Sequence, residues 1–569
     1  MNFNHILQAL QLVWTSSKKW TILLLIAQLM QAILPLINLY LIKLVVDSLT
    51  ETGLEDFQSV LQYVLLFGLV QLLIAVIQNY EQLISETQQQ LVTDYMSTIL
   101  IDKATSIDIS YYENPEYHDT FHLAQQQAMF RPVQILRNLT DLLRSGLLLL
   151  SLAGLLVYLH WAIAIILLCF ALPIAGVKWY YSRKLFEWEK RRINLEREAH
   201  YLNQILTTDT YAKEVRIFNL KLPLKKQFVE LRKLLFGEKL KIGKQRARAG
   251  FFARSAEIIA MTLTYGFIAW RTFNGAISIG DLVMYFQAFQ KGQAAIQQSI
   301  GAAVGLYNNR LFLSHLFELL KIQSLLQQPE QPLSLPPVLQ EGIKVEQLNF
   351  TYPNTMRPVL KNINLELKKG QVIALVGENG SGKTTLVKLL CRLYDSQQGK
   401  ISWDNVDIKT LNISDLRKRI SVIYQDFAKY FLTIQDNIQM ADWEMPLSEQ
   451  KIRTAARQSG AATFIEELPH QYEHKLSKRF KKGIELSGGQ WQKIALTRAF
   501  YKDADLIVLD EPSSAIDPIA EADIFNHFRK LATDKILVLV THRLYNLKIA
   551  DKIVVLKNGE IVESGTHDE

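Results

Sequence analysis

Apolar runs long enough to cross a membrane recur through the first 320 residues of this 569-residue chain and then stop. A spanning helix needs about 20 mostly apolar residues. Runs of this kind cover residues 20–42, 59–79, 255–274 and 281–305. A polar, proline-rich stretch follows, and the remaining sequence has the pattern of a water-soluble α/β domain. We therefore predict a membrane domain over 1–320, a linker over 321–341 and a second domain over 342–569.

A further apolar stretch, 145–177, is too long for one helix and barely long enough for two. One helix would give five crossings and would place the second domain outside. It would also place the basic segment 178–250, with about nineteen Lys and Arg residues, outside, against the cytoplasmic preference of these residues. Two helices that meet at His160-Trp161 give six spans and remove both conflicts. The loop over 47–56 contains acids but no Lys or Arg, which fits an outside location.

The net charge of +8 does not indicate nucleic-acid binding, because much of the basic excess lies in 178–250, beside an apolar segment. We predict no nucleic-acid partner. The two cysteines, Cys169 and Cys391, offer no disulfide framework or metal-ligand cluster. The first apolar run is too long for a removable signal peptide, so we expect it to remain as a membrane anchor.

The second domain contains the pattern Gly-x-x-x-x-Gly-Lys-Thr over residues 377–384, between a predicted strand, 372–376, and a predicted helix. Such a loop closes backbone amides around phosphates, and the helix N-terminus adds positive potential. Lys383 is expected to reach the β- and γ-phosphates of ATP, and the Thr384 hydroxyl to bind Mg²⁺. The predicted ATP-binding residues of this loop are Gly377, Glu378, Asn379, Gly380, Ser381, Gly382, Lys383, Thr384 and Thr385.

A second apolar strand, 506–510, ends in two carboxylates. Asp510 is predicted to hold Mg²⁺, directly or through water. Glu511 is placed to polarise the attacking water, which needs an acceptor in line with the γ-phosphate. The phosphate loop by itself occurs in many unrelated ATPases and GTPases, and together with these carboxylates it predicts a nucleotide hydrolase that uses Mg²⁺.

The pentapeptide Leu486-Ser487-Gly488-Gly489-Gln490 follows the phosphate loop by about a hundred residues, and the pair resembles the ATP-binding cassette (ABC) superfamily. The resemblance implies that two cassettes sandwich ATP, so that Ser487, Gly488, Gly489 and Gln490 of one chain face the Lys383 loop of the other. It also implies a second copy of the chain as partner. The further roles it implies are γ-phosphate sensing by His542, Mg²⁺ contact and coupling by Gln425, linkage of the two sites by Asp517, and adenine stacking by Tyr352.

Six spans with two long cytoplasmic excursions, followed by a cassette, resemble the exporter branch of this superfamily. The fold class that this implies is an α-helical membrane bundle followed by an α/β P-loop NTPase domain. In that branch the tips of the excursions press on the cassettes, and here the tips fall near 111–119 and 211–219. Each tip also fits an ordinary loop turn.

The basic stretch 478–482 stands where exporters often carry acidic residues, while the first tip is acidic through Glu113, Glu116 and Asp119. One interpretation is that the two meet as a complementary pair, and the other is that both are solvated charge runs. Glutamines and asparagines on the predicted spans also allow two interpretations. They face a water-filled cavity, or they hydrogen-bond between helices; they include Gln28, Gln31, Asn38, Gln71 and Gln297.

Residues 111–117 and 485–492 look like those of bacterial exporters of lantibiotics and related modified peptides. We therefore predict ATP-driven export of a peptide or amphipathic solute by alternating access, from a multi-pass protein of the bacterial cytoplasmic membrane with its cassette in the cytoplasm. The alternatives are a multidrug or lipid exporter of the same architecture and, less favoured, a regulatory ABC protein that moves nothing. The chain ends at Glu569, where members of the family normally continue into a helix.

Overall fold

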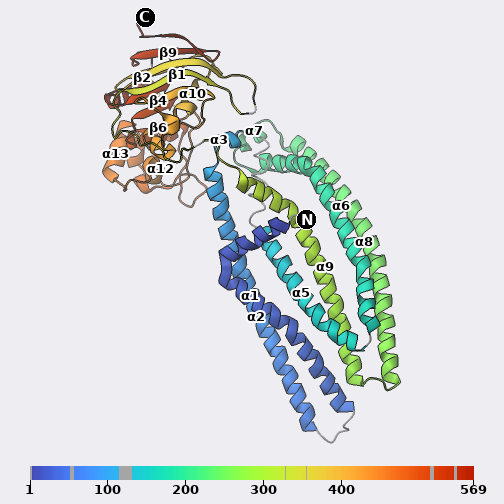
Figure 1. Cartoon of the computed structure of the whole chain (residues 1–569). Helices are drawn as coiled ribbons and strands as arrows, with labels where there is room; N and C mark the ends of the chain where they lie inside the picture. The colour runs from blue at the N-terminus through green and yellow to red at the C-terminus, as the bar shows by residue number, and fades with distance from the viewer. Residues whose placement is uncertain are drawn as a thin grey trace. The chain divides into compact units, whose positions relative to one another are not determined.

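The computed structural model describes residues 3–50, 57–114, 131–159, 161–326, 328–353, 355–512, 518–543 and 547–569. Contacts divide the chain into two compact units (Figure 1). The helical unit comprises Met1–Thr105 and Asp119–Ile322, and the α/β unit comprises Ser106–His118 and Gln323–Glu569. Residues 115–119 of the first expected tip, His160, and Asp517 lie outside the described residues.

Long helices form nearly all of the described helical unit, and each has between 29 and 53 residues. They are α1 (Phe3–Thr50), α2 (Phe57–Ser106), α5 (Arg131–Leu159), α6 (Trp161–Thr207), α8 (Lys221–Phe273) and α9 (Ile279–Lys321), with the short α7 (Ala212–Ile217) between α6 and α8. At 1.5 Å per residue, α8 is about 80 Å long, far more than the roughly 30 Å hydrocarbon core of a bilayer. These helices therefore extend well beyond any membrane-spanning part. α6 packs along α8, and α5 along α9 (Figure 1).

The apolar stretch 145–177 divides into two helices where the sequence predicts it, because α5 ends at Leu159 and α6 begins at Trp161. Both helices also run past the ends of the stretch, as the division requires. Within the described residues, two helical segments pass a strict test of length and hydropathy for a membrane span. They are Leu7–Thr50 and Phe57–Ser106, with best 18-residue windows of mean hydropathy 2.1 and 2.5. The total of six spans stays a prediction.

Polar side chains in the helical unit join neighbouring helices. The amides of Gln28 and Gln31 on α1 each donate to one carboxylate oxygen of Glu81 on α2, both at 2.8 Å. On α9, the Gln297 amide donates to Glu257 of α8 at 2.9 Å. The structure thus favours hydrogen bonding between helices over the cavity interpretation for these glutamines, and Gln71 likewise donates to Asn38 at 3.3 Å.

Two sheets form the framework of the α/β unit. An antiparallel sheet has the order β2-β1-β4-β5, and a larger sheet has the order β10-β9-β3-β8-β7-β6. In the larger sheet all neighbours except the β10–β9 pair are parallel. The strands are β1 (Gly342–Phe350), β2 (Leu360–Lys368), β3 (Val372–Val376), β4 (Gln398–Trp403), β5 (Val406–Asp407), β6 (Ile420–Ile423), β7 (Leu506–Asp510), β8 (Ile536–Val540), β9 (Lys552–Lys557) and β10 (Glu560–Gly565).

The central parallel strands β3, β7 and β8 are buried on both faces because each face has its own hydrophobic core. Alternate residues of β7 show the division: Leu506 and Val508 belong to the core shared with the antiparallel sheet and α10, while Ile507 and Leu509 belong to the other core. The helices of the α/β unit are α3 (Ile109–Tyr112), α10 (Lys383–Leu390), α11 (Ile413–Lys418), α12 (Ile434–Gln439), α13 (Glu449–Gln458), α14 (Ala462–Glu466), α15 (Gly488–Tyr501) and α16 (Pro518–Leu531), with single 3₁₀ turns at Ile408–Thr410, Met440–Asp442 and Gln471–Glu473.

The parallel arrangement brings the carboxyl ends of β3, β8, β7 and β6 to one edge of the larger sheet. In open α/β sheets this edge is the usual place of a ligand site. Each of these four strands is followed by residues that the sequence analysis selects.

Candidate ATP-binding and hydrolysis site

The loop between β3 and α10 is shaped by glycines in conformations that other residues avoid. Gly377 has φ of 154°, and a Cβ on it would lie 2.2 Å from the carbonyl oxygen of Leu556. Gly382, directly before α10, has φ of 107°. The loop therefore closes tightly between strand and helix, with its backbone free of side chains where phosphates are expected to bind.

Lys383 folds back over this loop. Its ammonium group donates to the carbonyl oxygens of Gly377 at 2.7 Å and Glu378 at 3.1 Å. Burial lowers the pKa of Lys383, against the opposing effect of the Glu511 and Asp510 carboxylates. The Lys383 ammonium would be stabilised by a bound polyanion such as a nucleotide phosphate, because the phosphate carries negative charge and the backbone carbonyls are neutral.

The Ser381 hydroxyl gives a direct test of whether phosphate fits here. Its oxygen is fully buried and, within the described residues, has no hydrogen-bond partner. It lies beside the position that a Cβ on Gly377 would take, at 2.8 Å. A buried hydroxyl without a partner is costly, and a phosphate oxygen in the loop would satisfy it.

Thr384 and Asp510 meet at the start of α10 and the end of β7. The Thr384 hydroxyl donates to the Asp510 carboxylate at 3.1 Å. Asp510 is only 4% exposed, and burial raises its pKa above the ordinary value. A hydroxyl and a buried carboxylate oxygen this close are suitable ligands for a hard cation such as Mg²⁺, whose charge would offset the burial of the carboxylate.

Glu511 contacts two of the side chains to which the family resemblance assigns roles, Gln425 and His542. The Gln425 amide, after β6, donates to one oxygen of Glu511 at 2.9 Å. The ring Nε2 of His542, after β8, lies 3.1 Å from the other oxygen. Glu511 has a positive φ of 49°, a conformation that is rare for a residue with a side chain and that often occurs at functional sites. Loops after three neighbouring strands thus converge on one carboxylate.

Tyr352 lies close to the start of α10. Its hydroxyl is 3.0 Å from that of Thr385, and its half-buried ring lies under the Lys388 ammonium, 5.5 Å from the ring centroid. The ring also meets Tyr394 edge-on, at 5.3 Å between centroids. Its role in adenine stacking stays a prediction.

The signature residues stand at the start of α15. Ser487 is the N-cap of α15, and it exchanges reciprocal hydrogen bonds with Gln490 in a capping box. Ser487 and Gly488 are exposed. In the part of the chain that the structure describes, no hydrogen bond joins these residues to the 377–384 loop.

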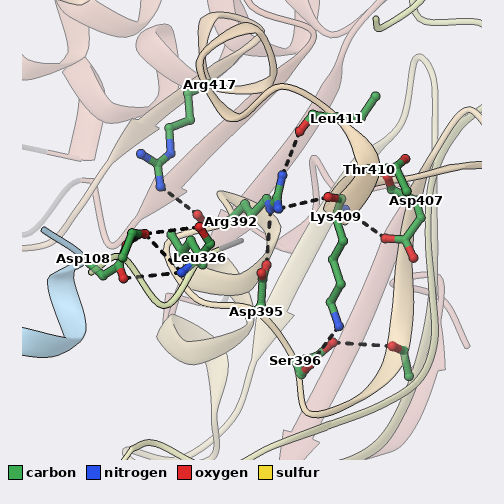
Figure 2. A network of polar contacts seen from close by, with 12 residues as sticks. Asp108, Leu326, Arg392, Asp395, Ser396, Asp407, Lys409, Thr410, Leu411 and Arg417 are labelled. Atoms are coloured by element: carbon green, nitrogen blue, oxygen red, sulfur yellow. Dashed lines mark hydrogen bonds and ion pairs between the residues drawn. The ribbon is translucent and has the colours of Figure 1, made fainter. Parts of the chain in front are cut away.

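The structure adds residues that the sequence analysis did not select. Arg392 is fully buried just after α10, and its guanidinium donates to the carbonyl oxygens of Leu411 at 2.9 Å and Lys409 at 3.1 Å (Figure 2). Arg417 donates to the Arg392 carbonyl at 2.7 Å. This network fixes the end of the helix that carries Lys383. The sequence does contain a signal for the role of Arg392, because an arginine stands there between the apolar residues Cys391 and Leu393 at the end of a predicted helix.

The expected pairing of the acidic tip with 478–482 is not made by Glu113 in the part of the chain that is described. Glu113 instead accepts from Lys388 at 2.7 Å and from the Tyr394 hydroxyl at 2.5 Å. Of the basic stretch, Arg479 lies over the Phe431 ring at 5.3 Å. The basic stretch belongs to the same compact unit as Glu113 and α10, so the partner is set by position within that unit, where Lys388 and Tyr394 lie within hydrogen-bonding distance of Glu113.

Comparison with known proteins gives two family matches. The ABC transporter model matches residues 360–514, and the ABC transporter transmembrane region matches residues 20–291. The nisin transport ATP-binding protein NisT of Lactococcus lactis subsp. lactis is 30% identical over 98% of this chain and 92% of its own length. The chain belongs to the ABC transporter family. It is therefore an integral membrane protein whose cytoplasmic ATP-binding domain hydrolyses ATP coupled to transport.

The names of other relatives include both peptide and lipid transport proteins. The subtilin transport ATP-binding protein SpaT of Bacillus subtilis is 29% identical over 98% of the chain and 91% of its own length. An ATP-dependent lipid A-core flippase of Chromohalobacter salexigens is 29% identical over 76% of the chain. A solved bacterial Atm1-family ABC exporter with ATP bound has a TM-score of 0.77 at 19% identity and covers 99% of the chain, so the chain has the fold of an ABC exporter. A fused membrane and ATP-binding chain of this kind typically works as a dimer.

Proposed function

We propose that this protein exports a peptide across the bacterial cytoplasmic membrane as a homodimer, by alternating access driven by ATP and Mg²⁺. The observation that carries the proposal is the convergence of Gln425 and His542 on Glu511, beside the Lys383 loop. A regulatory protein that moves nothing has no need for a complete hydrolytic site.

Each residue at the sheet edge has a distinct role in this proposal. The backbone amides of residues 377–382 and the Lys383 ammonium bind the β- and γ-phosphates. Thr384, Asp510 and Gln425 would hold Mg²⁺, which supplies charge neutralisation at the phosphates when bound. The Glu511 carboxylate accepts a proton from the attacking water. His542, already beside Glu511, contacts the γ-phosphate and keeps the carboxylate oriented.

The second half of each site is proposed to come from a second copy of the chain. The exposed start of α15, with Ser487 and the glycine amides after it, forms an anion site at a helix N-terminus. It is directed to the γ-phosphate bound by the partner's loop, because its own chain does not connect it to that loop. Asp517 keeps its proposed place between the two sites. The proposed domain limits remain 1–320, 321–341 and 342–569.

The second expected tip shows an apolar surface suited to a partner. Around α7, Ile217, Phe218 and Leu222 are 76%, 67% and 77% exposed. We assign this surface to contact with the cassette of the second copy, because exposed groups of large apolar side chains often mark protein–protein interaction sites.

A peptide is the proposed solute because the two relatives aligned over 98% of the chain are a nisin and a subtilin transport protein. The flippase relatives, aligned over about three quarters of the chain, support a lipid exporter as the second candidate.

The test is the ATPase activity of the purified chain in lipid, for wild type beside Glu511→Gln and Glu560→Gln. Glu560 is an exposed residue of β10 and serves as the matched control. Glu511→Gln should lower the rate at least about 100-fold, since the proton acceptor is lost, and the control should not. Lanthionine-containing peptides, hydrophobic drugs and lipids are then added in turn.

Stimulation by peptides that disappears in Glu511→Gln supports the peptide exporter. A rate that only lipids or drugs change contradicts the peptide assignment. Hydrolysis that is absent, or that does not depend on Glu511, contradicts the proposed exporter mechanism.

A further inference from the structure

A charged and aromatic cluster joins the segment after α2 to the helix of the phosphate loop. Both oxygens of Glu113 are engaged, one by the Lys388 ammonium at 2.7 Å and one by the Tyr394 hydroxyl at 2.5 Å. Burial acts to raise the pKa of Glu113, but the hydrogen bonds from Lys388 and Tyr394 outweigh it and the pKa is lowered. Glu113 is therefore a charged anchor whose partners both follow the phosphate loop in sequence.

Lys388 connects this anchor to Tyr352. Its ammonium lies 5.5 Å from the centroid of the Tyr352 ring and 5.9 Å from that of Tyr394. A cation within about 6 Å of a ring face is attracted to the ring, more strongly where water is partly excluded. The Lys388 side chain is only 20% exposed, so the contact is partly shielded from water.

We propose that Lys388 is a positioning residue that sets the affinity for the adenine base, and that Glu113 holds it over Tyr352. The inference rests on the proposed ATP site, in which adenine stacks on Tyr352. The Tyr352 ring meets Phe350 and Tyr394 edge-on, at 5.0 and 5.3 Å between centroids, and the Lys388 ammonium lies over it. In the proposed site, the base stacks on the ring that these contacts hold in place. Without the Lys388 ammonium, the Tyr352 ring is held less firmly and binds the adenine base more weakly.

The arrangement links base binding to the segment 106–114. By thermodynamic reciprocity, if the Glu113–Lys388 pair strengthens ATP binding, ATP binding strengthens the pair by the same factor. The last residue of α2, Ser106, is only two residues before Asp108 and seven before Glu113. Base binding is thus linked to the segment 106–114, which belongs to the α/β unit.

The test measures equilibrium binding of ATP and of inorganic tripolyphosphate to the full chain in lipid. Lys388→Met keeps the length of the side chain and removes its charge. It should weaken ATP about fivefold and leave tripolyphosphate unchanged, because only ATP carries a base. Lys388→Arg should restore ATP affinity, and Lys400→Met, at an exposed position of β4, is the control.

Glu113→Gln tests the anchor. It should weaken ATP in the same direction as Lys388→Met, and the double variant should show little further loss, because both changes remove one arrangement. Additive losses would overturn the role of Glu113.

Equal weakening of ATP and tripolyphosphate by Lys388→Met would overturn the inference, since the charge would then act on the phosphates. Unchanged ATP affinity would also overturn it. Tyr352→Ala separates this failure from failure of the ATP site: if that variant binds ATP as wild type does, adenine is not stacked on Tyr352 and the site assignment itself fails.

Discussion

Asp510 shows how function and stability oppose each other at a single residue. Its carboxylate is 4% exposed at the end of β7, and burial raises its pKa above the usual 3.8. The folded chain therefore binds a proton at Asp510 more tightly than the unfolded chain does. The cost of the buried charge is fully present above the folded pKa and disappears as the pH falls below the unfolded pKa.

We expect Asp510→Asn to raise the free energy of unfolding by about 1 kcal/mol at neutral pH while removing Mg²⁺-dependent ATP hydrolysis. The gain over wild type should shrink toward acid pH, because wild-type Asp510 then becomes neutral as well. Thermal unfolding of the detergent-solubilised chain at several pH values checks this. A gain that grows as the pH falls would contradict the raised pKa.

At the scale of elements, the end of α1 is locked to the start of α9. Lys43 forms an ion pair with Asp281 at 2.6 Å, and the Asp47 carboxylate accepts from the Gly280 amide at 2.8 Å. Asp281 also completes a capping box with Ser278 at the start of α9. The two helix ends therefore share their polar partners.

Gly280→Ala should break this lock. A Cβ at residue 280 would lie 2.4 Å from the Asp47 carboxylate and 2.5 Å from the backbone oxygen of Lys43, so α9 must shift. We expect a loss of about 1–3 kcal/mol, measured as a lowered Tm in detergent.

Gly266→Ala in α8 is the matched control, because a Cβ there meets no atom within 4 Å. It should leave the Tm unchanged or raise it slightly. Equal effects of the two substitutions would show that the close approach at Gly280 does not matter.

At the scale of the whole molecule, two segments lead into the α/β unit, one after α2 and one after α9, and they are hydrogen-bonded to each other. Asp108, after α2, accepts hydrogen bonds from the Ser324 hydroxyl, at 2.7 Å, and from the Leu325 amide, both after α9. It also accepts from the Leu326 amide (Figure 2). The Tyr111 hydroxyl adds a bond to the Gln323 carbonyl at 3.2 Å. One carboxylate thus ties together two chain passages more than 200 residues apart in sequence.

Asp108→Ala should release both passages. We expect the amides around Leu325 and Leu326 to exchange with deuterated water about tenfold faster or more, because they lose a charged acceptor. Residues 106–114 should lose protection with them, as measured by mass spectrometry on the full chain.

Asp404→Ala is the control for this substitution, since Asp404 also accepts from consecutive amides, those of Gln340, Glu341 and Gly342. Its effect should stay near residues 340–342. Unchanged exchange at Leu325 in Asp108→Ala would show that the tie contributes nothing.

Much of the architecture could be predicted from local sequence. Hydrophobic runs and the parity of crossings predicted the division of 145–177 into two helices at residue 160, which α5 and α6 confirm. Strand, glycine loop and helix patterns placed Lys383, Asp510 and His542 after buried strands. In a parallel sheet such positions meet at one edge, so their association follows from the pattern.

Side-chain partners distant in sequence were decided by tertiary structure alone. The glutamines of α1 pair with Glu81 of α2, and Glu113 pairs with Lys388 rather than with the basic stretch 478–482. Periodicity determines which face of a helix is polar, but not which atom lies opposite, because this depends on register and distance between packed elements. The sequence by itself thus determined the family, the two-part architecture and the edge of the sheet that carries the site. The tertiary structure decided which charged side chains pair, because the interaction between two charges depends on the distance between them and packing determines that distance.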